Sequence, residues 1–180
     1  MKGIVFTEFL ELVELKFGLE TVNEIIEDSD LKSKGVYTAI GTYDFSEMLS
    51  LISNLSAKTN ITIHDLLYVY GLHFFKVLKD NYPSIINKYK SPIDMLASID
   101  SHIHVEVRKI YPDAELPKFE VEVKENKSIT LVYTSSRSMY AFALGLIEKT
   151  FHHFNSNAKV NYSLLQEDGS KVKFVINENE

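Results

Sequence analysis

The sequence predicts an α+β fold in which an N-terminal helical part packs with a four-stranded antiparallel sheet. Apolar residues recur at helical spacing through the first part of the chain, whereas residues 119–124 alternate between apolar and charged side chains, as in a half-buried strand. Further on, a helical pattern over residues 139–154 lies between two pairs of strand patterns, in the order ββαββ. Helices that precede such a unit indicate an antiparallel sheet covered by helices.

Three helices are expected in the first third of the chain. Residues 1–17 carry an apolar stripe that ends at Gly18, and residues 19–27 form a second, shorter helix. A loop over residues 28–41 follows. Asp44 is then a good N-cap for a helix that runs to about residue 58.

The next helical region is longer and more apolar. Thr62 caps a helix over residues 63–79, whose wide apolar arc predicts deep burial. Gly71 within this helix costs on the order of 1 kcal/mol relative to alanine. The close approach of another backbone or of a flat ligand would justify that cost, and a position without a special role is the alternative. A short helical piece over residues 83–89 and a single helix over residues 93–111 complete the helical part.

Four strands are expected in the last third of the chain. The first two cover residues 119–124 and 128–135, and a short polar turn joins them. The last two cover residues 159–166 and 171–176, with Asp168-Gly169 as a strong hairpin signal between them.

Composition narrows the classes of function. The chain has 180 residues, 45% of them hydrophobic, which suits one domain with a substantial core. The net charge of −6 argues against nucleic-acid binding, and the absence of cysteine excludes zinc–thiolate sites, iron–sulfur clusters and cysteine-ligated or covalently attached haem. There is no signal-peptide core and no apolar run near the ~20 residues that span a bilayer. We therefore expect a cytoplasmic protein that binds neither nucleic acid nor a membrane.

A polar motif closes the second predicted strand. If the chain is extended there, Tyr133, Ser135 and Arg137 project from one side and offer a phenol, a hydroxyl and a guanidinium. Arginine can bind a carboxylate with two parallel hydrogen bonds, so this row suits a ligand with clustered carboxylates such as the haem propionates. A strand end whose polar residues are merely solvated is the alternative interpretation.

The six histidines are each interpreted first as structural or surface residues. His73, beside Phe74, is expected to be a satisfied core group. His102 and His104 are two residues apart and therefore lie on roughly opposite sides of a helix, so at most one of them faces a given pocket. Periodicity does not choose between the two.

With these residues identified, the chain resembles a bacterial H-NOX domain, the haem nitric oxide/oxygen-binding family that includes the haem domain of soluble guanylate cyclase. The resemblance covers essentially the whole chain. It rests on Tyr-x-Ser-x-Arg at residues 133–137, on Gly145, and on His104, which stands six residues before Ile110-Tyr111-Pro112 and thirteen before Pro117. It selects His104 over His102.

The resemblance implies a single domain over residues 1–180, with a helical subdomain over about residues 1–60 and a sheet subdomain over about residues 61–180. Haem b would lie between them. His104 would be the axial iron ligand. The other implied contacts to the haem are propionate binding by Tyr133, Ser135 and Arg137, distorting contacts from Pro117 and Val5, and a lining contact from Leu146.

The implied gas pocket is apolar. Oxygen-binding members of the family place a tyrosine nine residues after the motif tyrosine, where this chain has Phe142. Their supporting polar groups correspond to Phe9 and Phe74. The resemblance therefore implies a pocket without hydrogen-bond donors.

The function implied by the resemblance is that of a nitric oxide sensor rather than an enzyme. Nitric oxide, and as a second possible ligand carbon monoxide, would bind the haem, the iron–His104 bond would break, and the relaxed haem would shift the first helices. A separate partner, such as a histidine kinase or a cyclic-di-nucleotide enzyme, would then read the change. The alternatives are a haem-free interaction domain and a haem peroxidase-like enzyme, which would need a polar distal group such as His73 turned inward.

Overall fold

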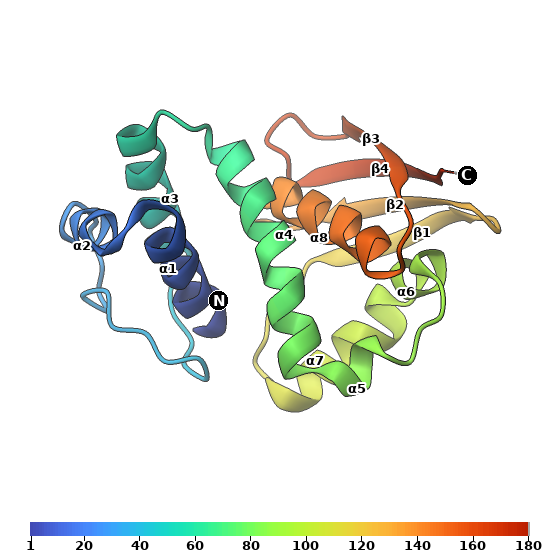
Figure 1. Ribbon diagram of the computed structural model, residues 1–180, viewed down its shortest axis with the longest axis horizontal. Helices are drawn as coiled ribbons and strands as arrows, with labels where there is room; N and C mark the ends of the chain where they lie inside the picture. The colour runs from blue at the N-terminus through green and yellow to red at the C-terminus, as the bar shows by residue number, and fades with distance from the viewer. Residues whose placement is uncertain (180) are drawn as a thin grey trace.

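The computed structural model describes residues 1–179 and contains a helical N-terminal part and a sheet-containing part (Figure 1). The N-terminal lobe consists of α1 (Ile4–Phe17), α2 (Leu19–Glu27) and α3 (Phe45–Thr59). Gly18 separates α1 from α2 with a φ of 88°, a backbone region that glycine enters without steric cost. The Asp44 carboxylate accepts a hydrogen bond from the Ser46 backbone N–H at 3.0 Å and caps α3, as predicted.

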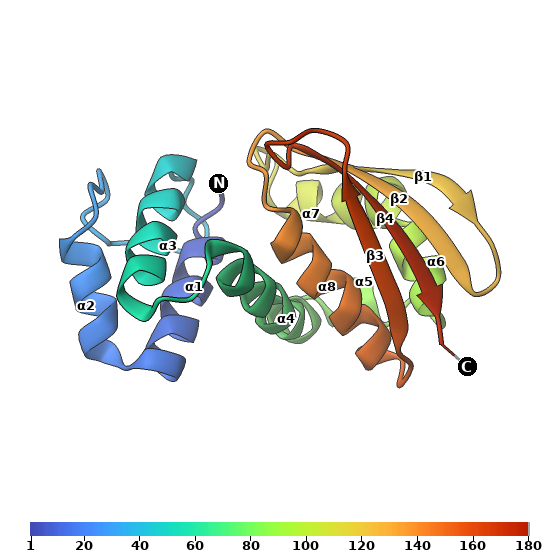
Figure 2. The same ribbon diagram turned by 90° about the horizontal axis from the view of Figure 1, so that it is seen from above.

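The long helix α4 (Ile63–Asn81) lies between the N-terminal lobe and the rest of the molecule, which we call the sheet lobe (Figures 1 and 2). Thr62 Oγ1 accepts a hydrogen bond from the Asp65 backbone N–H at 3.1 Å and caps this helix. On one side α4 packs against α1, and on the other it crosses α8 (Tyr140–His153). The apolar arc predicted from the sequence therefore serves two interfaces at once.

Two glycines allow α4 and α8 to touch through their backbones. A Cβ atom on Gly71 would lie 2.1 Å from the Phe142 carbonyl oxygen, and one on Gly145 would lie 2.2 Å from the Tyr68 carbonyl oxygen. Both distances are far below van der Waals contact. The cost of Gly71 within a helix is thus explained by the close approach of another backbone, the first of the two reasons that the sequence suggested.

The sheet is antiparallel throughout, with the order β1-β2-β4-β3. Its strands are β1 (Lys118–Lys124), β2 (Ser128–Thr134), β3 (Ala158–Leu164) and β4 (Lys171–Glu178). The inner face carries fully buried residues such as Leu131 and Phe174, and α8 covers it (Figure 2). This is the α+β arrangement predicted from the ββαββ pattern. Among the described helices, none combines the length and apolar character that crossing a bilayer requires.

The single helix predicted over residues 93–111 is wrong. The structure instead has α6 (Pro92–Ala97), a π-helical turn (Ile99–Ile103) and α7 (His104–Ile110), preceded by the short α5 (Pro83–Ile86). The His102 and Ile103 backbone N–H groups both donate to the Ser98 carbonyl oxygen, at 3.0 and 3.1 Å, which widens the turn before His104. Such wide turns inside helices often mark functional sites. Helical periodicity in the sequence does not reveal them.

Candidate functional site

A cavity of about 760 Å³ lies between the N-terminal lobe, α4, α8 and the segment from α5 to β1. Most of its wall is apolar and comes from residues such as Ile4, Phe75, Leu78, Met95, Leu96, Ile103 and Ile147. Its volume falls within the range of sites for small molecules and cofactors. An apolar cavity of this size with a few polar groups at defined points is suited to a large, flat, mostly apolar ligand.

His104 lines this cavity and is only 9% exposed. Its Nδ1 atom lies 2.8 Å from Asp100 Oδ1, and Asp100 Oδ2 accepts a hydrogen bond from the Phe119 backbone N–H at 3.0 Å. Since the carboxylate can only accept, Nδ1 carries the proton and the Nε2 lone pair of the neutral ring is left free. Burial lowers the pKa of His104, and the Asp100 carboxylate opposes this effect. The ring is therefore prepared as a metal ligand.

Asp100 is the site residue that the sequence analysis missed. It precedes His104 by four residues, a spacing that places two side chains on one face of a helix. A search for a carboxylate at that spacing would have singled it out. Asp100 also connects α7 to β1 through the Phe119 N–H, so it fixes His104 relative to the sheet.

Tyr133, Ser135 and Arg137 all line the cavity, but they do not do so as successive residues of one extended strand, which was the expectation. β2 ends at Thr134, and the chain then turns, with the Ser138 backbone N–H donating to the Ser135 carbonyl oxygen at 3.2 Å. The turn, rather than strand alternation, brings Ser135 and Arg137 to the cavity.

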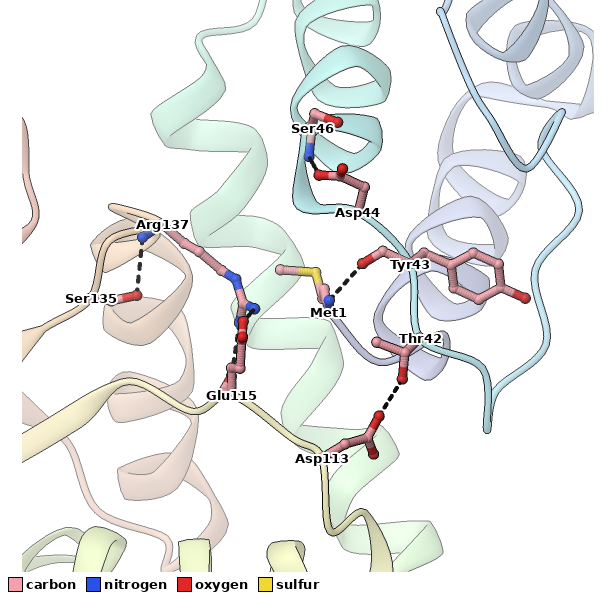
Figure 3. A network of polar contacts seen from close by, with 9 residues as sticks. All are labelled: Met1, Thr42, Tyr43, Asp44, Ser46, Asp113, Glu115, Ser135 and Arg137. Atoms are coloured by element: carbon pink, nitrogen blue, oxygen red, sulfur yellow. Dashed lines mark hydrogen bonds and ion pairs between the residues drawn. The ribbon is translucent and has the colours of Figure 1, made fainter.

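Each motif side chain is held in place by the surrounding structure. The buried Tyr133 hydroxyl accepts a hydrogen bond from the Met139 backbone N–H at 3.0 Å, and burial raises the pKa of its phenol. Ser135 Oγ accepts from the Arg137 backbone N–H at 3.2 Å. The Arg137 guanidinium donates to the backbone carbonyl of Glu115 at 2.8 Å and also pairs with the Glu115 carboxylate (Figure 3).

A polar network ties the N-terminal segment to the loop that leads into β1 (Figure 3). The Met1 ammonium donates to the Tyr43 carbonyl oxygen at 2.6 Å. Asp113 accepts hydrogen bonds from Lys2 Nζ at 3.1 Å and from Thr42 Oγ1 at 2.7 Å. All five of these residues line the cavity, as does Arg137.

Of the remaining residues expected at the haem or in the gas pocket, all but Phe9 line the cavity. Val5, Pro117 and Leu146 line the cavity, as do Phe74 and Phe142. Phe9 does not, because it is buried one layer behind, edge-on against Tyr70 with ring centroids 5.4 Å apart. Tyr70 in turn packs against Phe74 and Phe142, at centroid distances of 5.6 and 5.0 Å.

Phe74 and Phe142 form an aromatic wall of the cavity, and neither side chain can donate a hydrogen bond. The ring of Tyr70 packs against both phenylalanines, and its hydroxyl donates to the Val5 carbonyl oxygen at 2.6 Å. His73 is not among the cavity residues. The wall therefore consists of two apolar side chains, and the hydroxyl of the tyrosine packed against them is already hydrogen-bonded to the backbone.

The donor set fits haem better than a free metal ion. Within residues 1–179 there is no group of three or more His, Asp or Glu side chains that could hold a metal. An iron atom bound by His104 must therefore bring most of its ligands with it, as haem iron does. The apolar cavity would suit the macrocycle, and the Tyr133, Ser135 and Arg137 side chains at its wall would suit the carboxylates of such a group.

Comparisons with known proteins identify the family and the fold. The family model described as haem-NO-binding matches residues 2–162. The unliganded Fe(II) H-NOX protein from K. algicida is 62% identical with a TM-score of 0.98, covering 100% of this chain and 97% of that one. The H-NOX from Shewanella woodyi in its Fe(II)CO state, bound to IWP-051, is 37% identical with a TM-score of 0.83, covering 99% and 95%.

A third solved structure extends the comparison to nitric oxide. The H-NOX protein from S. oneidensis in the Fe(II)NO state is 25% identical with a TM-score of 0.92, and the match covers 100% of both chains. No curated protein matches the chain.

Proposed function

This chain belongs to the haem-NO-binding, or H-NOX, family of haem-based gas-sensing domains, and we propose that it is a sensor selective for nitric oxide over dioxygen. The observation that carries the proposal is the aromatic wall of Phe74 and Phe142, whose neighbouring hydroxyl on Tyr70 is already used by the Val5 carbonyl.

We propose haem b as the cofactor, because the chain has no cysteine for covalent attachment. His104 would bind the iron through Nε2, with Asp100 holding the ring. Tyr133, Ser135 and Arg137 would bind the propionates. When bound, haem supplies an open metal coordination position for a diatomic gas.

Selectivity would come from what the aromatic wall lacks. Bound dioxygen draws negative charge onto itself and gains from a nearby hydrogen-bond donor. A hydrogen bond to a charged group contributes about 1.5–3 kcal/mol, or roughly 10–150-fold in affinity. Phe142 and Phe74 cannot donate, so dioxygen loses this stabilisation. Nitric oxide needs no such donor.

Signal output would start at His104. His104 would hold the iron through Nε2, and its hydrogen bond to Asp100 would persist if nitric oxide weakened that contact, since the hydrogen bond uses the other ring nitrogen. Val5 and Pro117, which lie on opposite sides of the lobe boundary at the cavity, would then lose their distorting contacts, and the N-terminal lobe would shift. Such a change requires two arrangements of the N-terminal lobe, of which nitric oxide would favour one.

The ligands and partners follow from the same proposal. The S. oneidensis and Shewanella woodyi relatives have been solved with nitric oxide and carbon monoxide, respectively. We extend both gases to this chain, with nitric oxide as the signal. The partner would be a separate histidine kinase or cyclic-di-nucleotide enzyme. A peroxidase-like activity is disfavoured, because His73 faces Glu8 on α1 rather than the cavity.

An absorption spectrum of the reduced, haem-loaded protein tests the proposal. We expect the spectrum to be the same under air and under argon and to change on addition of nitric oxide. A change under air that argon reverses would refute the selectivity. The absence of a Soret band after reconstitution with haem would refute the sensor and favour a haem-free interaction domain.

A further inference from the structure

The contact between α1 and α4 joins the two lobes and has an aromatic interior with a polar edge. In the interior, Phe9 packs against Tyr70, and the Tyr70 hydroxyl donates to the Val5 carbonyl oxygen. At the edge, His73 on α4 faces Glu8 on α1. The polar edge therefore bridges the same boundary that the proposed signal must cross.

His73 carries a buried polar atom without a partner. Its Nε2 atom is shielded from solvent and, among residues 1–179, is the one buried side-chain nitrogen or oxygen that makes no hydrogen bond. This differs from the satisfied core group that the sequence suggested. The Glu8 Oε2 atom lies 3.9 Å away, which is too long for a hydrogen bond. Because folded proteins retain few such atoms, this one calls for a physical explanation.

Both groups are partly withdrawn from water. Burial lowers the pKa of His73 from its ordinary value of 6.5, and burial, helped by Glu11, raises the pKa of Glu8 from 4.5. Each group alone thus resists its charged form. The two shifts bring the titrations of Glu8 and His73 toward each other.

The other charged groups around the pair act in opposite directions. Glu11 on α1 favours a proton on His73 and on Glu8. Lys76 on α4 and Lys16 on α1 disfavour a proton on His73, and Lys76 also disfavours one on Glu8. The surroundings therefore neither force nor forbid a single shared proton.

We propose that Glu8 and His73 form a proton-operated clasp between the lobes, in which one proton from solvent bridges Glu8 Oε2 and His73 Nε2 in mild acid and leaves at alkaline pH. No bond other than that to the proton is made or broken. The bridged state gives Nε2 its missing partner, and it draws the edge of α1 toward α4 until the two atoms reach hydrogen-bond distance.

The clasp would make the proposed sensor sensitive to pH. Only this consequence rests on the proposed function, because the clasp itself does not require gas sensing. His73 directly precedes Phe74 of the aromatic wall, and Glu8 directly precedes Phe9, which packs behind that wall against Tyr70, so closing the clasp draws α1 toward the helix that carries Phe74. In mild acid the N-terminal lobe would be held more firmly on α4. The clasp itself can be tested without nitric oxide.

A double-mutant cycle on the haem-loaded protein tests the clasp. The variants are Glu8→Gln, His73→Gln and the double substitution, and thermal midpoints are measured at pH 5.5 and pH 8.0. We expect additive effects at pH 8.0. At pH 5.5 we expect the sum of the two single-variant decreases in thermal midpoint to exceed the decrease in the double variant by roughly 3–10 °C. A charge-assisted hydrogen bond shifts the midpoint of a domain of this length by about that much. His64→Gln, at the start of the same helix and remote from Glu8, is the control and should add to Glu8→Gln at both pH values.

Additive effects at both pH values would overturn the proposal, as would equal coupling at both, which would indicate a fixed hydrogen bond. If a variant fails to fold, ¹⁵N chemical shifts of the His73 ring in the wild-type Fe(II)CO protein provide the answer. Nε2 should gain its proton between pH 8 and pH 5, and a ring that keeps Nε2 unprotonated throughout would exclude the clasp. Neither result depends on oxygen exclusion, so failure of the clasp and failure of the sensor are separable.

Discussion

The Nδ1 atom of His104 lies 2.8 Å from the Oδ1 atom of Asp100, and the second Asp100 oxygen is held by the backbone N–H of Phe119. The carboxylate thereby links the proposed iron ligand to the first strand of the sheet. Asp100 lies inside the π-helical turn over Ile99–Ile103, and His104 directly follows that turn. The orientation of the imidazole is therefore set by backbone geometry around the turn.

Replacing Asp100 with alanine should loosen the haem. Without the carboxylate, the imidazole loses its fixed orientation and becomes a weaker ligand, and such partners typically contribute 10–100-fold in metal affinity. We expect haem transfer to apomyoglobin to be faster by about that factor. Asp94→Ala is the control, since Asp94 forms an exposed ion pair with Lys124 outside the cavity. Equal transfer rates for both variants would mean that Asp100 does not support His104.

Introducing a donor into the aromatic wall should create oxygen binding. In Phe142→Tyr, a hydroxyl is added to a ring that lines the cavity, and dioxygen affinity should rise by roughly 10–150-fold. The measurement is an oxygen titration of the reduced protein by absorption spectroscopy. Phe154→Tyr, just beyond the end of the same helix and outside the cavity, should leave oxygen binding undetectable. If Phe142→Tyr behaves like this control, the shape of the pocket rather than a missing donor excludes dioxygen.

Arg137 should contribute to haem retention through its planar fork and not through charge alone. Arg137→Lys keeps the charge but cannot form two parallel hydrogen bonds, so haem affinity should fall, and Arg137→Ala should reduce it further. Haem titration of the apoprotein measures both effects. Arg108→Ala removes an exposed arginine on α7 and serves as the control for charge. An Arg137→Lys variant with unchanged affinity would contradict bidentate binding.

A methyl group at the crossing of α4 and α8 should strain the fold. In Gly145→Ala the new Cβ would lie 2.2 Å from the Tyr68 carbonyl oxygen and 2.8 Å from the Leu72 nitrogen, so the helices must separate. Overpacking of this kind costs about 1–3 kcal/mol of unfolding free energy. Urea denaturation followed by circular dichroism measures it. Full wild-type stability would show that the crossing yields without cost.

The sequence by itself determined the fold class and most of the helices and strands. Alternation over residues 119–124, the Asp44 and Thr62 caps and the turn at Asp168-Gly169 are local signals, and each marks an element that forms. The half-burial that the alternation predicted is wrong, because Val121 and Val123 on β1 are exposed. The cavity residues His104, Tyr133, Ser135 and Arg137 were identified because their spacing matches a known family. The sequence shows that Gly71 lowers helix stability. It leaves open whether another backbone or a flat ligand approaches this position, or whether the glycine has no special role.

Only the tertiary structure decided the arrangements that depend on contacts between distant segments. The π-helical turn before His104 packs against β1 and α6, whereas the same apolar periodicity would suit a continuous helix. Phe9 lies behind Tyr70 rather than in the cavity because α1 packs onto α4 at an angle that no sequence spacing encodes. The unpaired Nε2 of His73 likewise results from where α1 places Glu8. Periodicity tells which face of a helix is buried, whereas packing between helices decides what that face meets.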